Sequence, residues 1–317
     1  MKYSFIIPMY NEINDIANTV QHCIQQKNGD YSWEIVLIDD CSTDGTFEYC
    51  YKEFSSYPNI HLMRNEVNKG VSYTRNIGVE AAAGDIVIFL NADELVDSCF
   101  IQKINQHYVN SADYVFPLSR VYNRTSPYGC FRDCYRLKKY NRPNMFMWSQ
   151  GFSCKKECFS KVGGFDTRYP GCGGEDWDFV SRLDMLYLNR VVDWSITVQH
   201  TVPEEAGNVL WHMYNRGRGS SYYDFIYNKK NPLKHLLKKC AYILFLLGIG
   251  LIINWSLSIS YIIYSFCKLF MEANGMRKSY ESPKYSIIAF YYLDRVLRNI
   301  GYDVNACRHL YKGIHYD

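Results

Sequence analysis

The chain has 317 residues, with 35 Lys and Arg against 32 Asp and Glu, which gives a formal net charge of +3. Apolar residues make up 48% and charged residues 21%, and this balance excludes a mostly disordered chain. So small a net charge over this length does not fit a nucleic-acid-binding surface, so we expect no nucleic-acid partner. The 29 Tyr residues favour contact with carbohydrate or with a membrane interface.

The 12 cysteines are expected to be reduced thiols, because no N-terminal signal-peptide pattern precedes them. Two CxxxC pairs leave a zinc site open as an alternative, although their spacing departs from the common CxxC ligand pattern.

Residues 1–117 alternate short apolar runs with amphipathic helical patterns. Such an alternation predicts an α/β fold, with a Rossmann-like, mostly parallel sheet flanked by helices on both faces. Pro8 is expected to stop the first strand. The predicted strands are 3–7, 34–38, 60–63, 85–90 and 114–116, and the predicted helices are 13–24, 43–54 and 71–83.

Polar residues follow three of these predicted strands: PMYNE at 8–12, DDCSTDG at 39–45 and NADE at 91–94. The carboxyl ends of parallel strands meet at one edge of a sheet, where ligands bind. Acidic residues from the three loops should therefore converge, and converging carboxylates need a cation or hydrogen-bond donors. A divalent metal with a nucleotide ligand is the simplest explanation.

The following segment, 118–200, is less regular, but GGEDWD at 173–178 stands out. A helix is predicted over 179–188, followed by a strand over 192–198 that carries His200.

Residues 241–267 contain no charged side chain, and lysines and arginines flank them on both sides. Two helices are predicted, over about 232–253 and 255–273. Basic flanks on both sides favour a hairpin or an interfacial pair on the cytoplasmic face of the cell membrane over a single crossing. The alternative is an ordinary buried helical hairpin of a soluble enzyme.

Four segments in this order, IIPMYNE, VLIDDCSTDGT, NKGVSYTRNIGVEAAAGDIVIFLNADE and GGEDWDF, resemble those of a membrane-associated bacterial family 2 glycosyltransferase with the GT-A fold. The resemblance implies transfer of a sugar from a nucleotide-sugar donor to a glycan or lipid-linked acceptor, with inversion. It covers about 3–220, so we expect a catalytic domain over 1–220, with a nucleotide-binding half to about 117 and an acceptor half beyond it. Hydrophobic membrane helices at 221–278 and a cytosolic helical segment at 279–317 should follow.

The resemblance also assigns residues to the nucleotide-sugar site. Each of four residues has an alternative interpretation: Glu12 as a first-turn helix acid, Asp40 as a capping residue, and Lys69 and Arg75 as members of solvated ion pairs on a helix face. Arg216 and Arg218 resemble a flexible basic segment that closes over the donor phosphates. The assigned residues are Pro8, Tyr10, Glu12, Asp39, Lys69, Arg75, Asn91, Asp93 and Arg218.

Asn91 stands where the family has the first aspartate of its DxD motif, and Asp93 matches the second. The resemblance makes Asp93 a ligand of Mn²⁺ or Mg²⁺ and suggests His200 as another. Asn91→Asp is then expected to be tolerated or mildly activating. The departure at Asn91 also supports the alternative of a catalytically silent module that binds a nucleotide-sugar or glycan.

Glu175 and Asp176 match the ED motif of the family, which makes Asp176 the general base for the acceptor hydroxyl. Trp177 offers an apolar face for an acceptor sugar ring. The alternative is a helix N-terminus that carries acidic residues.

Overall fold

The computed structural model of the protein describes residues 1–124, 126–140, 149–169, 173–226, 230–252 and 293–304, with positions 259, 263, 265, 267 and 306. The chain divides into two compact units, and each is described by itself. The first comprises 1–122 and 144–201, and the second comprises 123–143 and 202–317. The predicted boundary of a catalytic domain at residue 220 stays a prediction.

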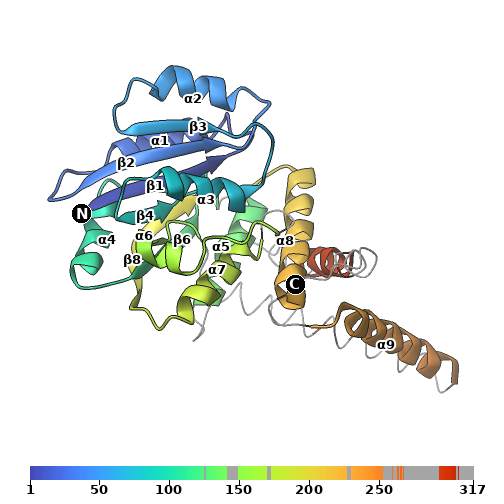
Figure 1. Ribbon diagram of the computed structural model, residues 1–317. Coiled ribbons are helices and arrows are strands. Elements are labelled where there is room, and N and C mark those ends of the chain that lie inside the picture. The colour runs from blue at the N-terminus through green and yellow to red at the C-terminus, as the bar shows by residue number, and fades with distance from the viewer. Residues whose placement is uncertain are drawn as a thin grey trace. The chain divides into compact units, whose positions relative to one another are not determined.

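The first unit is built on one eight-stranded mixed sheet with helices on both faces (Figure 1). Its first four strands pair in parallel, as predicted. In the remaining half β7 is antiparallel to β4 and β6, β8 is parallel to β6, and β5 is antiparallel to β8, so a mostly parallel sheet was too simple a prediction. In spatial order the strands are β3 (Ile60–Arg64), β2 (Ser32–Asp39), β1 (Lys2–Met9), β4 (Ile86–Phe89), β7 (Ser153–Lys155), β6 (Tyr114–Val121), β8 (Arg190–His200) and β5 (Glu94–Val96).

Pro8 lies inside β1 and does not end it, which corrects the expectation from the sequence. It pairs with Ile38 of β2. The pairing of β1 with β4 ends earlier, at Ile6 and Phe89, so the missing N–H of the proline falls beyond that ladder. The strand therefore continues to Met9 and brings the following loop next to the end of β2.

Alternating residues of the central strands face two separate cores. Tyr3, Phe5 and Ile7 of β1 pack with buried residues of the helices on one face. On the other face, Phe89 and Phe152 pack with aromatic residues from the α6 and α7 region. The first face carries α1 (Ile16–Ile24), α2 (Thr46–Phe54) and α4 (Phe100–Val109), and the second carries α3 (Val71–Ala81), α6 (Lys156–Lys161) and α7 (Glu175–Asp184).

The second unit is helical where the structure describes it. It contains α5 (Pro127–Tyr140), α8 (Ala206–Ile226), α9 (Pro232–Ile252) and a C-terminal helix over 293–304. Arg216 and Arg218 lie within α8, so the expected flexible basic segment is a regular helix.

The predicted hydrophobic hairpin is not established. Its first helix corresponds to α9, and its second, at 255–273, lies almost wholly outside the described residues. Among the residues that the structure describes, no helix is both long enough and apolar enough to cross a membrane.

Candidate active site

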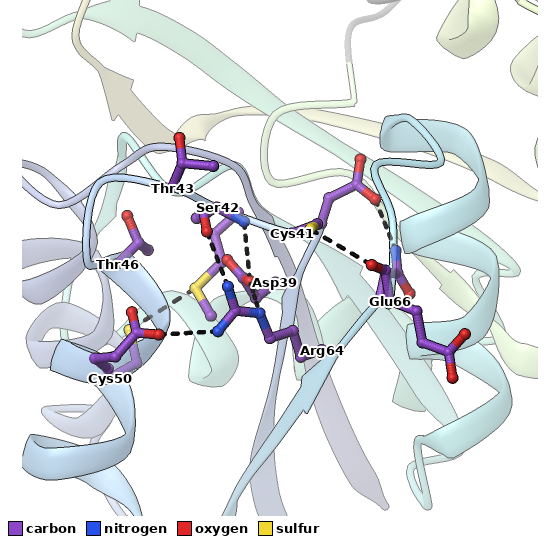
Figure 2. A network of polar contacts seen from close by, with 12 residues as sticks. Asp39, Cys41, Ser42, Thr43, Thr46, Cys50, Arg64 and Glu66 are labelled. Atoms are coloured by element: carbon purple, nitrogen blue, oxygen red, sulfur yellow. Dashed lines mark hydrogen bonds and ion pairs between the residues drawn. The ribbon is translucent and has the colours of Figure 1, made fainter.

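The loop after β2 is held by a polar network around Asp39 (Figure 2). Asp39 is fully buried, and its Oδ2 lies 3.2 Å from Nε of Arg64 and 3.1 Å from the backbone nitrogen of Ser42. Arg64 also donates to Oε1 of Glu48 at 2.9 Å and to the carbonyl of Ser42 at 2.9 Å. Arg64 sits opposite Asp39 because β2 and β3 pair in parallel and bring these two residues into register.

This network engages only one of the two carboxylate oxygens of Asp39. Its Oδ1 is buried and has no hydrogen-bond partner among the described residues. An unpaired buried carboxylate oxygen is costly, and the cost is removed when a ligand donates an N–H to it. The geometry therefore fits the predicted contact of Asp39 with a ligand.

The carboxylate of Asp40 accepts hydrogen bonds from a neighbouring loop. It accepts from Nδ2 of Asn65 at 2.7 Å and from the backbone nitrogens of Lys69 and Gly70, both at 2.8 Å. These bonds fix the loop that leads into α3. The capping interpretation is wrong, because these two nitrogens precede α3, which begins at Val71, and neither α2 nor α3 has a side-chain cap.

The loop after β1 is tied to the same region. Asn11 adopts a left-handed conformation with φ of 57°, and its N–H donates to Oγ of Ser42 at 2.9 Å. The N–H of Glu12 donates to Oγ1 of Thr46 at 2.9 Å. Tyr10 is 47% exposed, so its ring is available to a ligand.

Acidic side chains converge at the side chain of Glu12, as the sequence predicted. Burial, followed by the neighbouring carboxylates of Asp93, Asp15 and Asp44, raises the pKa of Glu12 to about 8. Carboxylates contributed by three loops therefore repel one another here, and a cation would relieve that repulsion.

The turn after β4 places Asn91 and Asp93. Oγ1 of Thr19 donates to the carbonyl of Ala92 at 2.7 Å, and the N–H of Thr201 donates to the carbonyl of Asp93 at 3.2 Å. The pairing of β5 with β8 sets Glu94 opposite His200. His200 is thus brought to the turn that carries Asp93, and its Nδ1 lies 2.6 Å from the carbonyl of Thr201.

Arg75 connects the two acidic motifs. It is 3% exposed, and its Nη2 donates to Oδ1 of Asn91 at 2.9 Å and to Oγ of Ser149 at 3.3 Å. Its Nη1 lies 3.3 Å from Oε1 of Glu175, and its guanidinium lies over the ring of Phe165. The interpretation of Arg75 as an exposed ion-pair residue is therefore wrong.

Asp176 lies in the first turn of α7, which begins at Glu175 and not at the predicted residue 179. Gly174 precedes it with φ of 100°, a conformation that favours glycine. Burial, followed by the Glu175 carboxylate, raises the pKa of Asp176 to about 7, against the opposing effect of Arg75. A carboxyl with this pKa is suited to take up a proton near neutral pH.

The positions of the other predicted site residues indicate less about their roles. Lys69 is exposed, with its ammonium 6.0 Å from the ring centroid of Tyr73. Trp177 is half-buried, and its backbone N–H donates to Oδ1 of Asp176 at 2.9 Å. Arg218 belongs to the second unit, where its Nη1 donates to Asn215 at 3.2 Å. Pro8 is buried in its strand.

Two residues that hold the site were missed in the sequence. Arg64 could have been anticipated, because a third parallel strand ends beside the second and a charge there faces Asp39. Ser149 gave no signal, since its contact with Arg75 spans 74 residues of chain outside any motif.

The predicted metal site is incomplete in the part of the chain that the structure describes. Within the described ranges, no group of three His, Cys, Asp or Glu side chains is placed to hold a metal ion. The predicted ligands Asp93 and His200 therefore lack a third protein ligand in that part of the chain.

Comparison with known proteins identifies the protein family. Residues 4–160 match the model for glycosyl transferase family 2. Residues 4–160 form a domain of this family. Residues 136–191 also match a model described as the N-terminal domain of galactosyltransferase.

Curated relatives align with part of the chain. TuaG of Bacillus subtilis, named for teichuronic acid biosynthesis, is 36% identical over 91 residues, 29% of this chain and 35% of that protein. Validoxylamine A glucosyltransferase of Streptomyces hygroscopicus subsp. limoneus is 24% identical over 251 residues, 68% of this chain and 55% of that protein. The chain thus spans between about a third and three fifths of the length of such relatives.

Solved structures share the fold. The mannosyltransferase PcManGT from Pyrobaculum calidifontis, in complex with GDP-Man and Mn²⁺, matches with a TM-score of 0.64 at 18% identity, over 94% of this chain and 86% of that chain. Residues 1–349 of Staphylococcus aureus TarS with UDP-GlcNAc match with a TM-score of 0.54 at 16% identity, over 100% and 93%. Both likenesses support the expected GT-A fold for the mixed sheet.

Proposed function

We propose that the protein transfers a sugar from a nucleotide-sugar to an acceptor hydroxyl, with inversion, and that Asp176 is the general base. The buried Asp176 carboxyl, with its raised pKa, carries the proposal. As the acceptor oxygen attacks the anomeric carbon, Asp176 takes its proton, and the nucleoside diphosphate leaves from the opposite face of the sugar. The acceptor is a glycan or a lipid-linked sugar, and Trp177 adjoins its binding place.

Asp39 anchors the donor through its base. The free Oδ1 accepts a hydrogen bond, so it requires an N–H on the base edge. Uracil, thymine and guanine each carry a ring N–H of this kind. Relatives in fold have been solved with UDP-GlcNAc and with GDP-Man, which is consistent with such a base.

A divalent cation, Mn²⁺ or Mg²⁺, fits the acidic environment of the loops. Asp93 would supply an oxygen ligand, and the carboxylate repulsion that adds to the effect of burial on the pKa of Glu12 is what a cation would offset. His200, next to the Asp93 turn, is the further candidate ligand. When bound, the cation would neutralise charge on the departing diphosphate.

We also propose that the second unit rests on the cytoplasmic surface of a membrane. The helix α9 exposes apolar side chains at Leu233, Leu237 and Leu244 and lysines at 234 and 238. An apolar surface with interspersed cations suits the interface of an anionic lipid bilayer. The test is flotation with anionic and neutral vesicles. Leu237→Ser should reduce binding to anionic vesicles, and equal recovery of this variant and the native protein would contradict the contact.

The donor proposal is tested by thermal shift with UDP-, GDP- and dTDP-sugars. A donor at 100 times its Kd stabilises the protein by about 2.7 kcal/mol. Asp39→Asn should abolish that shift, whereas Glu157→Gln, which changes an exposed carboxylate of α6, should leave it intact. A shift unchanged in Asp39→Asn would overturn the donor assignment. A protein that binds donor but never turns it over would be the silent module.

A further inference from the structure

Glu175, the residue before the proposed base, is held at both of its carboxylate oxygens. Oε1 lies 3.3 Å from Nη1 of Arg75, and Oε2 accepts a hydrogen bond from the N–H of Gly173 at 2.6 Å. Glu175 and Arg75 are both buried, so this ion pair is shielded from water. A buried carboxylate with a cation on one oxygen and a backbone donor on the other is fixed in its orientation. The proposed chemistry, however, gives Glu175 no step.

The guanidinium of Arg75 is shared among three partners, and the proposed base is not one of them. Besides Glu175, it donates through Nη2 to Oδ1 of Asn91 at 2.9 Å and to Oγ of Ser149 at 3.3 Å. Among the described residues, Arg75 forms no hydrogen bond or ion pair with Asp176. The cation therefore lies near the base and is turned toward other groups.

Charges of opposite sign act on the Asp176 carboxyl from two elements. Burial raises the pKa of Asp176 most, and the Glu175 carboxylate on the same helix adds to that rise. Arg75 of α3 opposes it, as do the backbone N–H groups of Trp177 and Ser149, and the pKa settles at about 7. The proton affinity of the base thus depends on where the charge of Arg75 is directed.

The other carboxylate in this turn of α7 has a cation of its own. Oδ2 of Asp178 lies 2.7 Å from Nη2 and 3.1 Å from Nε of Arg182, one turn later in the helix. This pair leaves Glu175 as the carboxylate that holds Arg75.

Without the charge of Glu175, Arg75 would have no carboxylate partner. A buried guanidinium that lacks a counter-ion is unfavourable. Asp176, the next residue in the same helix turn, is the carboxylate that would take the place of Glu175. An arginine in direct contact lowers the pKa of a carboxyl by about 1–3 units and occupies the oxygens that should receive a proton. Glu175 and Asp176 are therefore competitors for one cation.

We propose that Glu175 is a positioning residue, which holds Arg75 away from Asp176 and so keeps the Asp176 carboxylate available to the acceptor hydroxyl. In the transfer, the O–H bond of the acceptor breaks and its proton passes to Asp176. The oxygen forms the bond to the anomeric carbon as the bond to the nucleoside diphosphate breaks, while Glu175 and Arg75 exchange no proton. This inference rests on the proposed function, because it takes Asp176 as the base.

The test compares the pH dependence of turnover in the native protein and in Glu175→Gln. Turnover needs deprotonated Asp176, so the acid limb of the profile follows the pKa of this residue. In the variant the limb should move by about 1–3 pH units toward acid, because Arg75 turns to Asp176. Glu157→Gln, which changes an exposed carboxylate of α6, should keep the native profile. A limb that stays in place in Glu175→Gln, or moves toward alkaline pH, would overturn the proposal.

A double variant shows whether Arg75 causes the change. Replacing Arg75 and Glu175 together by Met removes the cation along with its partner, and such an exchange of a buried ion pair for apolar side chains is often neutral for stability. The acid limb should then lie within about one pH unit of its native position. A limb displaced as far toward acid as expected for Glu175→Gln would contradict the proposal, and this holds even if Glu175→Gln itself does not fold.

A measurement without turnover separates this inference from the proposed function. In protein labelled with ¹³C at the aspartate carboxyl carbons, the Asp176 resonance is identified by its loss in Asp176→Asn, and its titration gives the pKa directly. The same displacement toward acid is expected in Glu175→Gln. If the displacement is seen but no nucleotide-sugar is turned over, the proposed function fails and the positioning of Arg75 by Glu175 stands. If turnover occurs but the Asp176 titration does not move, the positioning role fails alone.

Discussion

Arg75 lies 3.3 Å from the carboxylate of Glu175, a residue 100 positions later in the chain. The same guanidinium holds Asn91, so a single buried side chain sets the distance between the strand end that carries the predicted metal ligand and the helix that carries Asp176. The turn after β4 and the start of α7 are thereby fixed relative to each other within the first unit.

Replacing Arg75 by Met should be severely destabilising. It leaves Glu175 buried without its cation, a change that costs about 3–5 kcal/mol. Chemical denaturation measures the loss. The control is Lys103→Met, which breaks an exposed pair with Asp97 and should cost about 1 kcal/mol or less. A loss in Arg75→Met no greater than in this control would show that the buried pair has no stabilising role.

Asp176→Asn should lower turnover by about 10²–10⁴, the usual contribution of a general base, because the amide cannot accept the acceptor proton. Donor affinity should barely change. Initial rates and donor Kd are measured side by side, with Glu157→Gln as a neutral control. Weaker donor binding at unchanged turnover would move Asp176 into the donor site.

The raised pKa of Asp176 also links stability to pH. Between the unfolded pKa near 4 and about 7, the folded protein holds a proton that the unfolded chain has released, so stability falls as pH rises through that window. Asp176→Asn should therefore raise the Tm at pH 8 and change it little at pH 4. A Tm that is lower than the native value at pH 8 would contradict this linkage.

Asn91→Asp should destabilise the protein, contrary to what the motif alone suggests. Nδ2 of Asn91 donates to Oε1 of Glu94 at 2.7 Å, and an aspartate would set two carboxylates against each other. We expect a loss of about 1–3 kcal/mol, larger at pH 8 than at pH 5.5. Asn65→Asp tests the same change against Asp40, which Asn65 contacts at 2.7 Å. Native stability in Asn91→Asp would mean that the turn rearranges.

The parallel half of the sheet was predictable because its strands, from four to eight residues long, are mostly apolar and are bounded by polar loops. The other half was not. β7 has three residues, too few to show an alternation, and it is held by pairing with β4 and β6. Residues 118–172 contain α5, β7 and α6, where the sequence showed no pattern.

Much of the site followed from motifs, but its connections did not. Asp39 and Asn91 were expected at the ends of strands, whereas Asp176 was expected just before a helix and lies in its first turn. That Arg75 joins Asn91 to Glu175, and that Arg64 occupies one oxygen of Asp39, are contacts between distant segments. Asp40 was expected to cap a helix, but its carboxylate contacts Asn65 and Gly70 of the loop before α3 instead.

The central claim is that the first unit cleaves a nucleotide-sugar through a centre that includes Asp176. The direct measurement is release of nucleoside diphosphate from the donor that gives the largest thermal shift, with Mn²⁺ and an oligosaccharide or lipid-linked acceptor, by the native protein and by Asp176→Asn. The account predicts acceptor-dependent release by the native protein and a loss of about 10²-fold or more in the variant. Equal release by both proteins would contradict it.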